Sequence, residues 1–136
     1  MSSSLVSYRG ASTWVKDASL SVWMYCAAEK MRDYPLGTAL CDRWMQLLAG
    51  SYCGWLNPLL DELLETEAHL VLLRAVNEEL SVQSSDVSSV ALTAAAVGGA
   101  DAVWTRSVPA HVVRETAKLI APLLQDNRPG SRPSDS

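Results

Sequence analysis

The hydrophobic positions between residues 57 and 80 follow one pattern and then change to another. Four leucines between residues 59 and 64 fall on one face of a helix, at about 100° per residue. Beyond His69 the apolar residues point in every direction, which is typical of a helix buried on all sides. Asn57 and Pro58 favour the start of a helix, as N-cap and first helical residue. The pattern therefore predicts a central helix over residues 57–80, threaded through the core, with a break near residues 67–68 left open.

Other segments of the chain carry the same kind of signal. Periodic apolar positions, prolines and capping residues predict helices over residues 12–33, 35–50, 84–97 and 107–125. Pro35 separates the first two, because the residue before a proline avoids helical dihedral angles. Pro122 is expected to kink or shorten the last one. At residues 90–97, VALTAAAV, a strand is the alternative, since Val and Thr favour strands, but no second strand is predicted to pair with it.

The predicted fold class is therefore all-α, a compact bundle of five or six helices, mainly antiparallel. The first helix and the central helix (about residues 57–80) are expected to be buried. A chain of 136 residues fits one domain with a sizeable core. We expect an irregular N-terminal lead over residues 1–11, a single helical domain over residues 12–125, and a disordered tail over residues 126–136.

Composition and charge exclude several classes of function. The net charge is −4, and Lys and Arg are scattered rather than gathered into the basic stripe that nucleic acids require. No apolar run reaches the roughly 18 residues of a membrane span. Three cysteines without a recognisable export signal predict reduced thiols and a cytoplasmic protein. We expect no nucleic acid and no membrane among the partners.

The first candidate site is an acidic set at the start of the predicted central helix. It comprises Asp61, Glu62, Glu65 and His69. Asp61, Glu65 and His69 are spaced four apart, so an unbroken helix would place them on one arc. Such a set could hold a divalent metal, or pair a carboxylate with an imidazole for acid–base chemistry. The alternative interpretation is a solvated helix face whose first turn is acidic because of the helix dipole.

Part of this segment resembles a known enzyme family. Glu62-Leu-Leu-Glu65 is similar to the E-x-x-E element of the MazG-like all-α nucleotide pyrophosphohydrolases, and residues 83–86, Gln-Ser-Ser-Asp, stand where that family has E-x-x-D. The resemblance implies a magnesium site in which Glu62, Glu65 and Asp86 bind the metal at the nucleotide phosphates. Gln83 departs from the pattern, because a neutral amide replaces a carboxylate ligand.

A group of aromatic residues is the second candidate. Trp44, Tyr52 and Trp55 flank a tight turn beside the acidic residues. Tryptophan and tyrosine are frequent at the energetic centres of protein interfaces. The alternative is that all three are core residues at a helix junction.

Arg74 forms a further candidate with Glu67 and Glu78, because the three lie on one otherwise apolar arc of the predicted helix. They form either a buried ion pair or polar contacts to a partner. Cys26, Cys41 and Cys53 are expected to be buried, inert thiols, since the close ligand pairs of zinc sites do not occur.

The chain contains no recognisable nucleotide loop, zinc motif or nucleophile motif, which favours a binding protein over an enzyme. We predict a small acidic protein-interaction module without a cofactor: an inhibitor, an immunity-type or a regulatory binding protein, or a self-associating dimer. Its partner-binding residues are predicted to be Asp61, Glu62, Glu65, His69, Trp44, Tyr52 and Trp55. The first alternative is the magnesium-dependent hydrolase. The second is a small-molecule-binding bundle with an apolar cavity lined by Trp23, Met24, Trp44 or Trp104.

Overall fold

The chain begins with a β-hairpin rather than a helix. A computed structural model describes residues 3–50, 60–97, 99 and 102–125. Strands β1 (Ser3–Tyr8) and β2 (Ala11–Lys16) pair in antiparallel register, with Tyr8 opposite Ala11. The two residues between them, Arg9 and Gly10, have positive φ angles of 51° and 85°. Positive φ at both positions is characteristic of the type I′ turn, whose twist matches that of the flanking strands.

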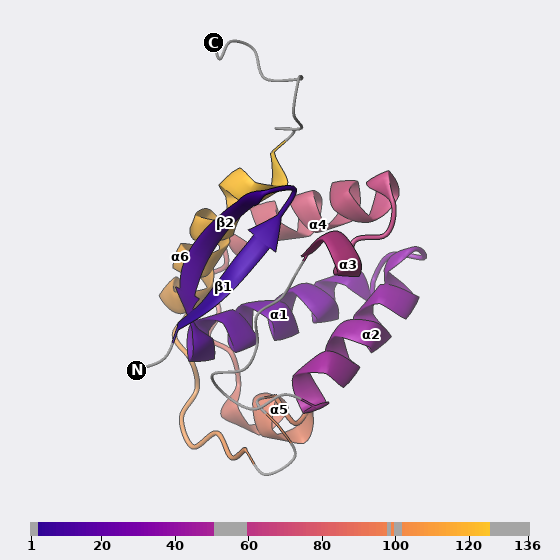
Figure 1. The fold of residues 1–136 in the computed structure, drawn as a ribbon. Coiled ribbons are helices and arrows are strands. Elements are labelled where there is room, and N and C mark those ends of the chain that lie inside the picture. Colours follow the sequence, from indigo (N-terminus) through magenta and orange to yellow (C-terminus); the bar gives the residue numbers. More distant parts are fainter. Residues whose placement is uncertain (1–2, 51–59, 98, 100–101, 126–136) are drawn as a thin grey trace.

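The hairpin contradicts the predicted all-α bundle and the predicted irregular lead over residues 1–11. Within the described residues the fold is mixed, with a two-stranded antiparallel sheet packed on helices (Figure 1). The first helix consequently starts at Asp17, not at residue 12. One face of the hairpin faces the core through Ser4, Val6 and Tyr8. The side chain of Ser4 donates a hydrogen bond to the buried carboxylate of Asp17, which attaches the hairpin to this helix.

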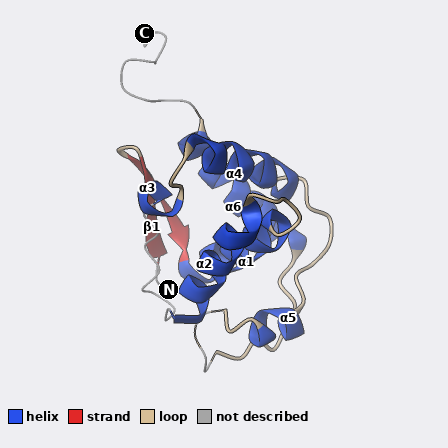
Figure 2. Cartoon of the chain, turned by 90° about the vertical axis from the view of Figure 1, so that its right-hand side faces the viewer, coloured by secondary structure: helices blue, strands red, loops and turns tan. Residues whose placement is uncertain are grey.

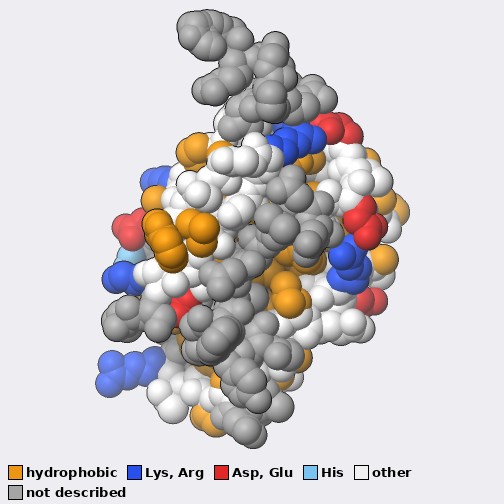
Figure 3. Space-filling model, in the orientation of Figure 1, with side chains coloured by type: hydrophobic (Ala, Val, Ile, Leu, Met, Phe, Trp, Pro, Cys, Tyr) orange, Lys and Arg blue, Asp and Glu red, His pale blue; other side chains and the backbone are white. Residues whose placement is uncertain are grey.

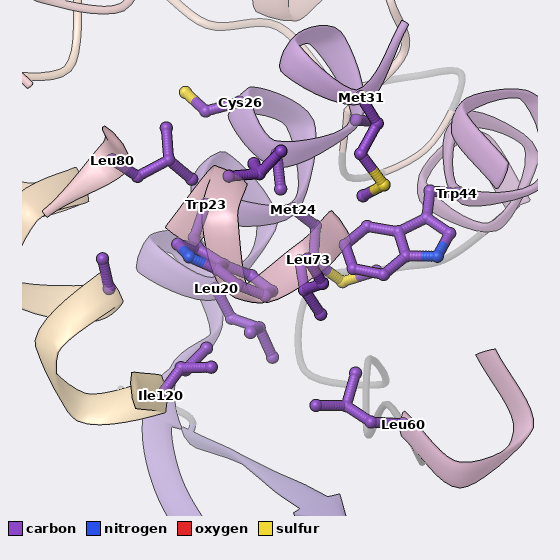
Figure 4. Close-up of a cluster of buried hydrophobic side chains, with 14 of the residues drawn as sticks. Leu20, Trp23, Met24, Cys26, Met31, Trp44, Leu60, Leu73, Leu80 and Ile120 are labelled. Carbon is purple, nitrogen blue, oxygen red and sulfur yellow. The ribbon is translucent and has the colours of Figure 1, made fainter. Parts of the chain in front are cut away.

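Helix α1 (Asp17–Met31) occupies the centre of the molecule. It contacts helix α2 (Gly37–Gly50), helix α4 (Glu67–Leu80), helix α6 (Ala110–Ile120) and both strands. Leu20, Trp23, Met24 and Met31 are fully buried, and Figure 4 shows them among side chains from the other helices. The prediction that the first helix is buried is therefore confirmed, as is the helix predicted over residues 35–50.

The predicted central helix is interrupted. Its described part consists of the short helix α3 (Leu60–Leu63) and the longer helix α4, separated by residues 64–66. Thr66 caps α4, because its side-chain oxygen accepts a hydrogen bond from the His69 backbone N–H. The break left open in the sequence is thus real, just before Glu67. Helix α4 also exposes one side to solvent, since Val71 is 55% exposed.

A buried amide joins three of these helices. Asn77, on α4, is 3% exposed. Its side-chain oxygen accepts a hydrogen bond from the indole N–H of Trp23 on α1, at 2.8 Å. Its side-chain nitrogen donates to the backbone carbonyl of Ala117 on α6, at 3.0 Å. A single side chain therefore satisfies two buried polar groups and sets the positions of α1, α4 and α6 relative to each other.

Residues between α4 and α6 form an excursion from the helical core. Helix α5 (Ser89–Ala94) lies at one end of the molecule, and Figure 2 shows it separated from α1, α4 and α6, although its Leu92 is fully buried. Val87 and Val108 close the base of the excursion with two backbone hydrogen bonds, at 2.8 and 2.9 Å. Residues 89–94 are helical, so the preferred helix is confirmed over part of its range and the strand alternative is wrong.

The C-terminal elements agree with the predicted last helix and its proline. Helix α6 begins after Pro109, and the 3₁₀ turn η1 (Ala121–Leu124) follows it with Pro122 in its first turn. The change of helix type is the expected effect of a proline, which provides no N–H for the helical ladder. The predicted tail over residues 126–136 lies outside the described residues.

Candidate functional site

Glu65, in the predicted acidic set, has a partner within the chain. Its carboxylate forms an ion pair with Arg43 of α2, with 2.9 Å between the nearest atoms. Both side chains are largely exposed, so the pair contributes little to stability but does balance the charge. Asp61 and Glu62 lie in α3, and their side chains are outside the described part of the structure.

The side chain of His69 accepts a hydrogen bond from the local backbone and does not extend a row of acidic residues along one helix face. Its ring Nδ1 accepts a hydrogen bond from the Glu65 backbone N–H at 3.1 Å, just before the capped start of α4. The break between α3 and α4 also removes the single helical face on which Asp61, Glu65 and His69 were predicted to lie. Because Nδ1 is occupied, only Nε2 of this ring can face a ligand.

Glu65 and Asp86, two of the residues predicted to bind magnesium, form contacts in separate places. Asp86 accepts a hydrogen bond from the Ala110 backbone N–H at 3.0 Å, which places its carboxylate at the start of α6. Glu65 follows α3 and Asp86 precedes α5, and Figures 1 and 2 show α3 and α5 in different parts of the molecule. Among the residues that the structure describes, no three His, Cys, Asp or Glu side chains come together as a metal site.

The aromatic candidates and the predicted apolar cavity both involve Trp44. This side chain is fully buried and packs against Trp23, with 5.9 Å between ring centroids (Figure 4). Trp44 therefore belongs to the core, while Tyr52 and Trp55 lie outside the described residues. Trp104 is only partly buried, at the edge of the core, where its indole N–H donates to the Val97 carbonyl. Of the residues predicted to line a cavity, Trp23, Met24 and Trp44 instead pack tightly together.

The predicted cluster around Arg74 takes a different form. Arg74 donates through Nε to the Leu124 carbonyl at 2.8 Å, and so holds the 3₁₀ turn η1 against α4. Glu67 forms an ion pair with Arg9 in the hairpin turn at 3.1 Å. These contacts join α4 to the N-terminal hairpin and to the turn η1, so their role is structural.

Two of the three thiols can be placed, and both are buried. Burial raises the pKa of the Cys26 thiol to about 11, against smaller opposing effects of Gln83 and Lys30. Burial likewise raises the pKa of Cys41. A raised thiol pKa reduces the fraction of nucleophilic thiolate at neutral pH. These two residues therefore fit the predicted inert thiols, and Cys53 lies outside the described residues.

Cys26 is expected to react slowly with alkylating reagents in the native protein. At pH 8 the rise in its pKa from 9.0 to about 11 lowers the thiolate fraction about 100-fold. Iodoacetamide labelling followed by peptide mass spectrometry should show at least this difference between native protein and protein unfolded in urea. Labelling of native Cys26 at the rate seen in urea would contradict the burial that the structure assigns to it.

The most distinctive surface feature is a groove between the hairpin and α6. We call it the Trp14 groove: it measures about 410 Å³ and is lined by Ser3, Trp14, Val15, Lys16, Ser19, His111, Val112, Glu115, Thr116 and Leu119. Trp14 lies on the outward face of β2 and is 65% exposed, and Leu119 on α6 is 49% exposed. Figure 3 shows hydrophobic side chains gathered at the surface over the hairpin.

The two walls of the Trp14 groove differ in charge. Trp14 and Lys16, two residues apart on β2, share the outward face of the hairpin. On α6, His111, Glu115 and Leu119 are spaced four apart and form one stripe. The groove thus has a cationic wall and an anionic wall on either side of apolar groups. The sequence does not reveal this groove, because the hydrophobic pattern of residues 3–16 does not identify a hairpin with an outward face.

Comparison with known proteins assigns no family, since no family model, no curated protein and no solved structure matches this chain. In the part of the chain that the structure describes, no helix has both the length and the hydrophobicity needed to cross a lipid bilayer.

Proposed function

We propose that this chain is a protein-interaction module and that the Trp14 groove is its binding surface. The observation that carries the proposal is the 65% exposure of Trp14, beside a hollow of about 410 Å³. A tryptophan side chain buries roughly 150–250 Å² when it is covered, so leaving it in water forgoes a large hydrophobic contribution. Tryptophan is also among the residues most enriched at the energetic centres of protein interfaces.

The chemistry of the groove defines the partner it fits. Trp14, Val112 and Leu119 offer apolar contacts, and Ser19 and Thr116 also line the groove. Lys16 and Glu115 stand on opposite walls. The complementary surface is a protein segment with an exposed apolar side chain, flanked by an acidic group for Lys16 and a basic group for Glu115.

This surface differs from the acidic one suggested by the sequence. Glu65, which belongs to the predicted acidic set, and the nearby Glu67 have their charges balanced by Arg43 and Arg9. Balanced charges attract a basic partner only weakly, because the local field of each carboxylate is offset by its neighbour. An exposed tryptophan beside a hollow supports the role of binding protein more strongly than these paired carboxylates do.

Site-specific photo-crosslinking tests the proposed function. A benzoylphenylalanine at position 12, which is exposed on the outward face of the hairpin near Trp14, should form a discrete protein adduct in lysate of the native cells. The matched control places it at position 71, which is also exposed but lies on α4. The adduct should disappear in Trp14→Ser, because the hydrophobic anchor of the complex is lost.

Affinity measurement then completes the test. The adducted protein is identified by mass spectrometry, purified and titrated against the unmodified chain by calorimetry. Trp14→Ser should weaken binding by about 30-fold or more, as expected for a hot-spot tryptophan, whereas Val71→Ser should not change it. Equal adducts at positions 12 and 71, or an affinity unaffected by Trp14→Ser, would refute the proposed function.

A further inference from the structure

We propose that the protein bound at the Trp14 groove is a second copy of this chain, in a twofold-symmetric dimer. This inference rests on the proposed function and names its partner. A twofold interface uses the same patch on both subunits, so the patch must be complementary to itself. The Trp14 groove contains the components that this requires: a projecting apolar side chain, a hollow beside it, one cation and one anion.

The positions of the two walls allow the groove to pair with the same groove of a second copy. β2 forms one wall and α6 the other, and the two elements are in contact along the groove. A twofold axis that runs along the groove, in the plane of the interface, brings β2 of each copy opposite α6 of the other. Trp14 then lies over the partner's Leu119, and Lys16 faces the partner's Glu115. Both contacts occur twice in the dimer.

The charges on these walls are available for such contacts. Within the described residues, the ion pairs are Arg9–Glu67, Lys30–Glu79, Arg32–Glu29 and Arg43–Glu65. Neither Lys16 nor Glu115 takes part in them, although both are exposed. A cation and an anion that have no such partner in their own copy can pair across the interface and fix the register of the two copies.

Self-association is also supported by the balance of the patch. An acidic or basic partner would be favoured by a groove of one sign, but this groove carries one charge of each sign on opposite sides of the apolar groups. Under the twofold rotation each charge meets its opposite. The alternative rotation, which would place β2 against β2 and α6 against α6, puts both Lys16 side chains on one wall and both Glu115 side chains on the other, so neither charge meets its opposite.

Charge reversal in single variants and in their mixture is the decisive experiment. Lys16→Glu places two acids opposite each other at both contacts of its homodimer, and Glu115→Lys places two bases there. Each variant should dimerise at least about tenfold more weakly than the wild type in sedimentation equilibrium. A 1:1 mixture of the two should form a heterodimer, visible by native mass spectrometry, because both contacts then pair opposite charges.

Substitutions of two exposed apolar residues, one in the groove and one outside it, provide a test and its matched control. Trp14→Ser should yield a folded monomer with an unchanged far-UV circular dichroism spectrum, and Val71→Ser on α4 should leave the dimer intact. Glu78→Lys, a charge reversal at an exposed α4 position, should also leave it intact. A dimer that survives Trp14→Ser and both groove reversals, or a mixture of the reversed variants without a heterodimer, would overturn the proposed dimer.

The outcomes separate this inference from the function on which it rests. A wild-type chain that stays monomeric up to about 0.5 mM overturns the dimer, since a dimer with a dissociation constant of about 1 mM or tighter would be detected there. If crosslinking at position 12 then captures a different protein with the Trp14 dependence described above, the interaction function stands with another partner. If position 12 gives no specific adduct either, both proposals are wrong.

Discussion

Asn77→Asp is expected to lower the free energy of unfolding by at least about 3 kcal/mol at pH 7.5, which is typical of a buried polar network left with an uncompensated charge. The wild-type amide accepts from the Trp23 indole and donates to the Ala117 carbonyl. A carboxylate keeps the first contact but directs an oxygen at a carbonyl oxygen in the second. It also carries a charge at a position that is 3% exposed.

The loss should depend strongly on pH. Burial and the Ala117 carbonyl both disfavour the charged form, so the pKa of the introduced carboxyl in the folded protein rises above the ordinary value of about 3.9. The unfolded chain then releases this proton at lower pH than the folded chain does. Stability relative to wild type should fall as pH rises from about 3.9 to the raised folded pKa, by up to about 1.4 kcal/mol per pH unit.

Urea denaturation of wild type and variant at pH 4.5 and 7.5 measures this difference. Near pH 4.5 the protonated acid has the shape of the amide and can still donate to Ala117, so most of the stability should return. Gln46→Glu makes the same amide-to-acid change at an exposed position of α2 and controls for net charge. A destabilisation that is equal at both pH values would show that Asn77 does not hold this network.

Residues 3–16 show where the sequence was insufficient. The turn is Arg9-Gly10 rather than Asn-Gly, and only the glycine signals the positive φ angles that this turn needs. Ser4 is buried because it donates to Asp17, a contact that no local pattern reveals. Leu5 and Trp14, opposite each other on the outer face, remove the alternation of apolar and polar residues that identifies a half-buried strand.

The central segment was predicted better, because its signals are local. The change of pattern near His69 coincides with a real change of structure, at the Thr66 cap of α4. The prediction that the leucines before the break face the core is also confirmed for Leu60 and Leu64, which are buried. What it could not show is that α1, rather than α4, has neighbours on most sides, because that depends on how distant elements pack.

None of the described residues that were predicted to bind a partner lines the Trp14 groove. Tryptophan is common both in cores and in interfaces, and the structure places Trp44 in the core and Trp14 at the surface. Both have apolar neighbours in the sequence, so periodicity does not distinguish them. The distinction depends on the strand partner of Trp14 and on the position of α6, which joins the groove from about 100 residues further along the chain.

Gly37→Ala is expected to destabilise the protein by about 3 kcal/mol, near the upper end of the usual range for overpacking. Gly37 starts α2, directly after the tight connection from α1. A Cβ atom on this residue would lie 2.0 Å from the Met31 backbone oxygen and 2.7 Å from its carbonyl carbon. Backbone atoms cannot rotate away as a side chain can, so the connection itself has to move.

The position of this connection makes the movement costly. The Met31 oxygen already accepts a hydrogen bond from the Tyr34 N–H at 3.0 Å, and the Gly37 N–H donates to the Tyr34 carbonyl at 2.9 Å. Displacing either helix to relieve the clash also disturbs Met31 and Leu40, which are buried on the two sides of the connection. Thr38→Ala, at the exposed neighbouring position, should change the urea midpoint little. Equal midpoints for Gly37→Ala and wild type would show that α1 and α2 do not approach as closely as this connection requires.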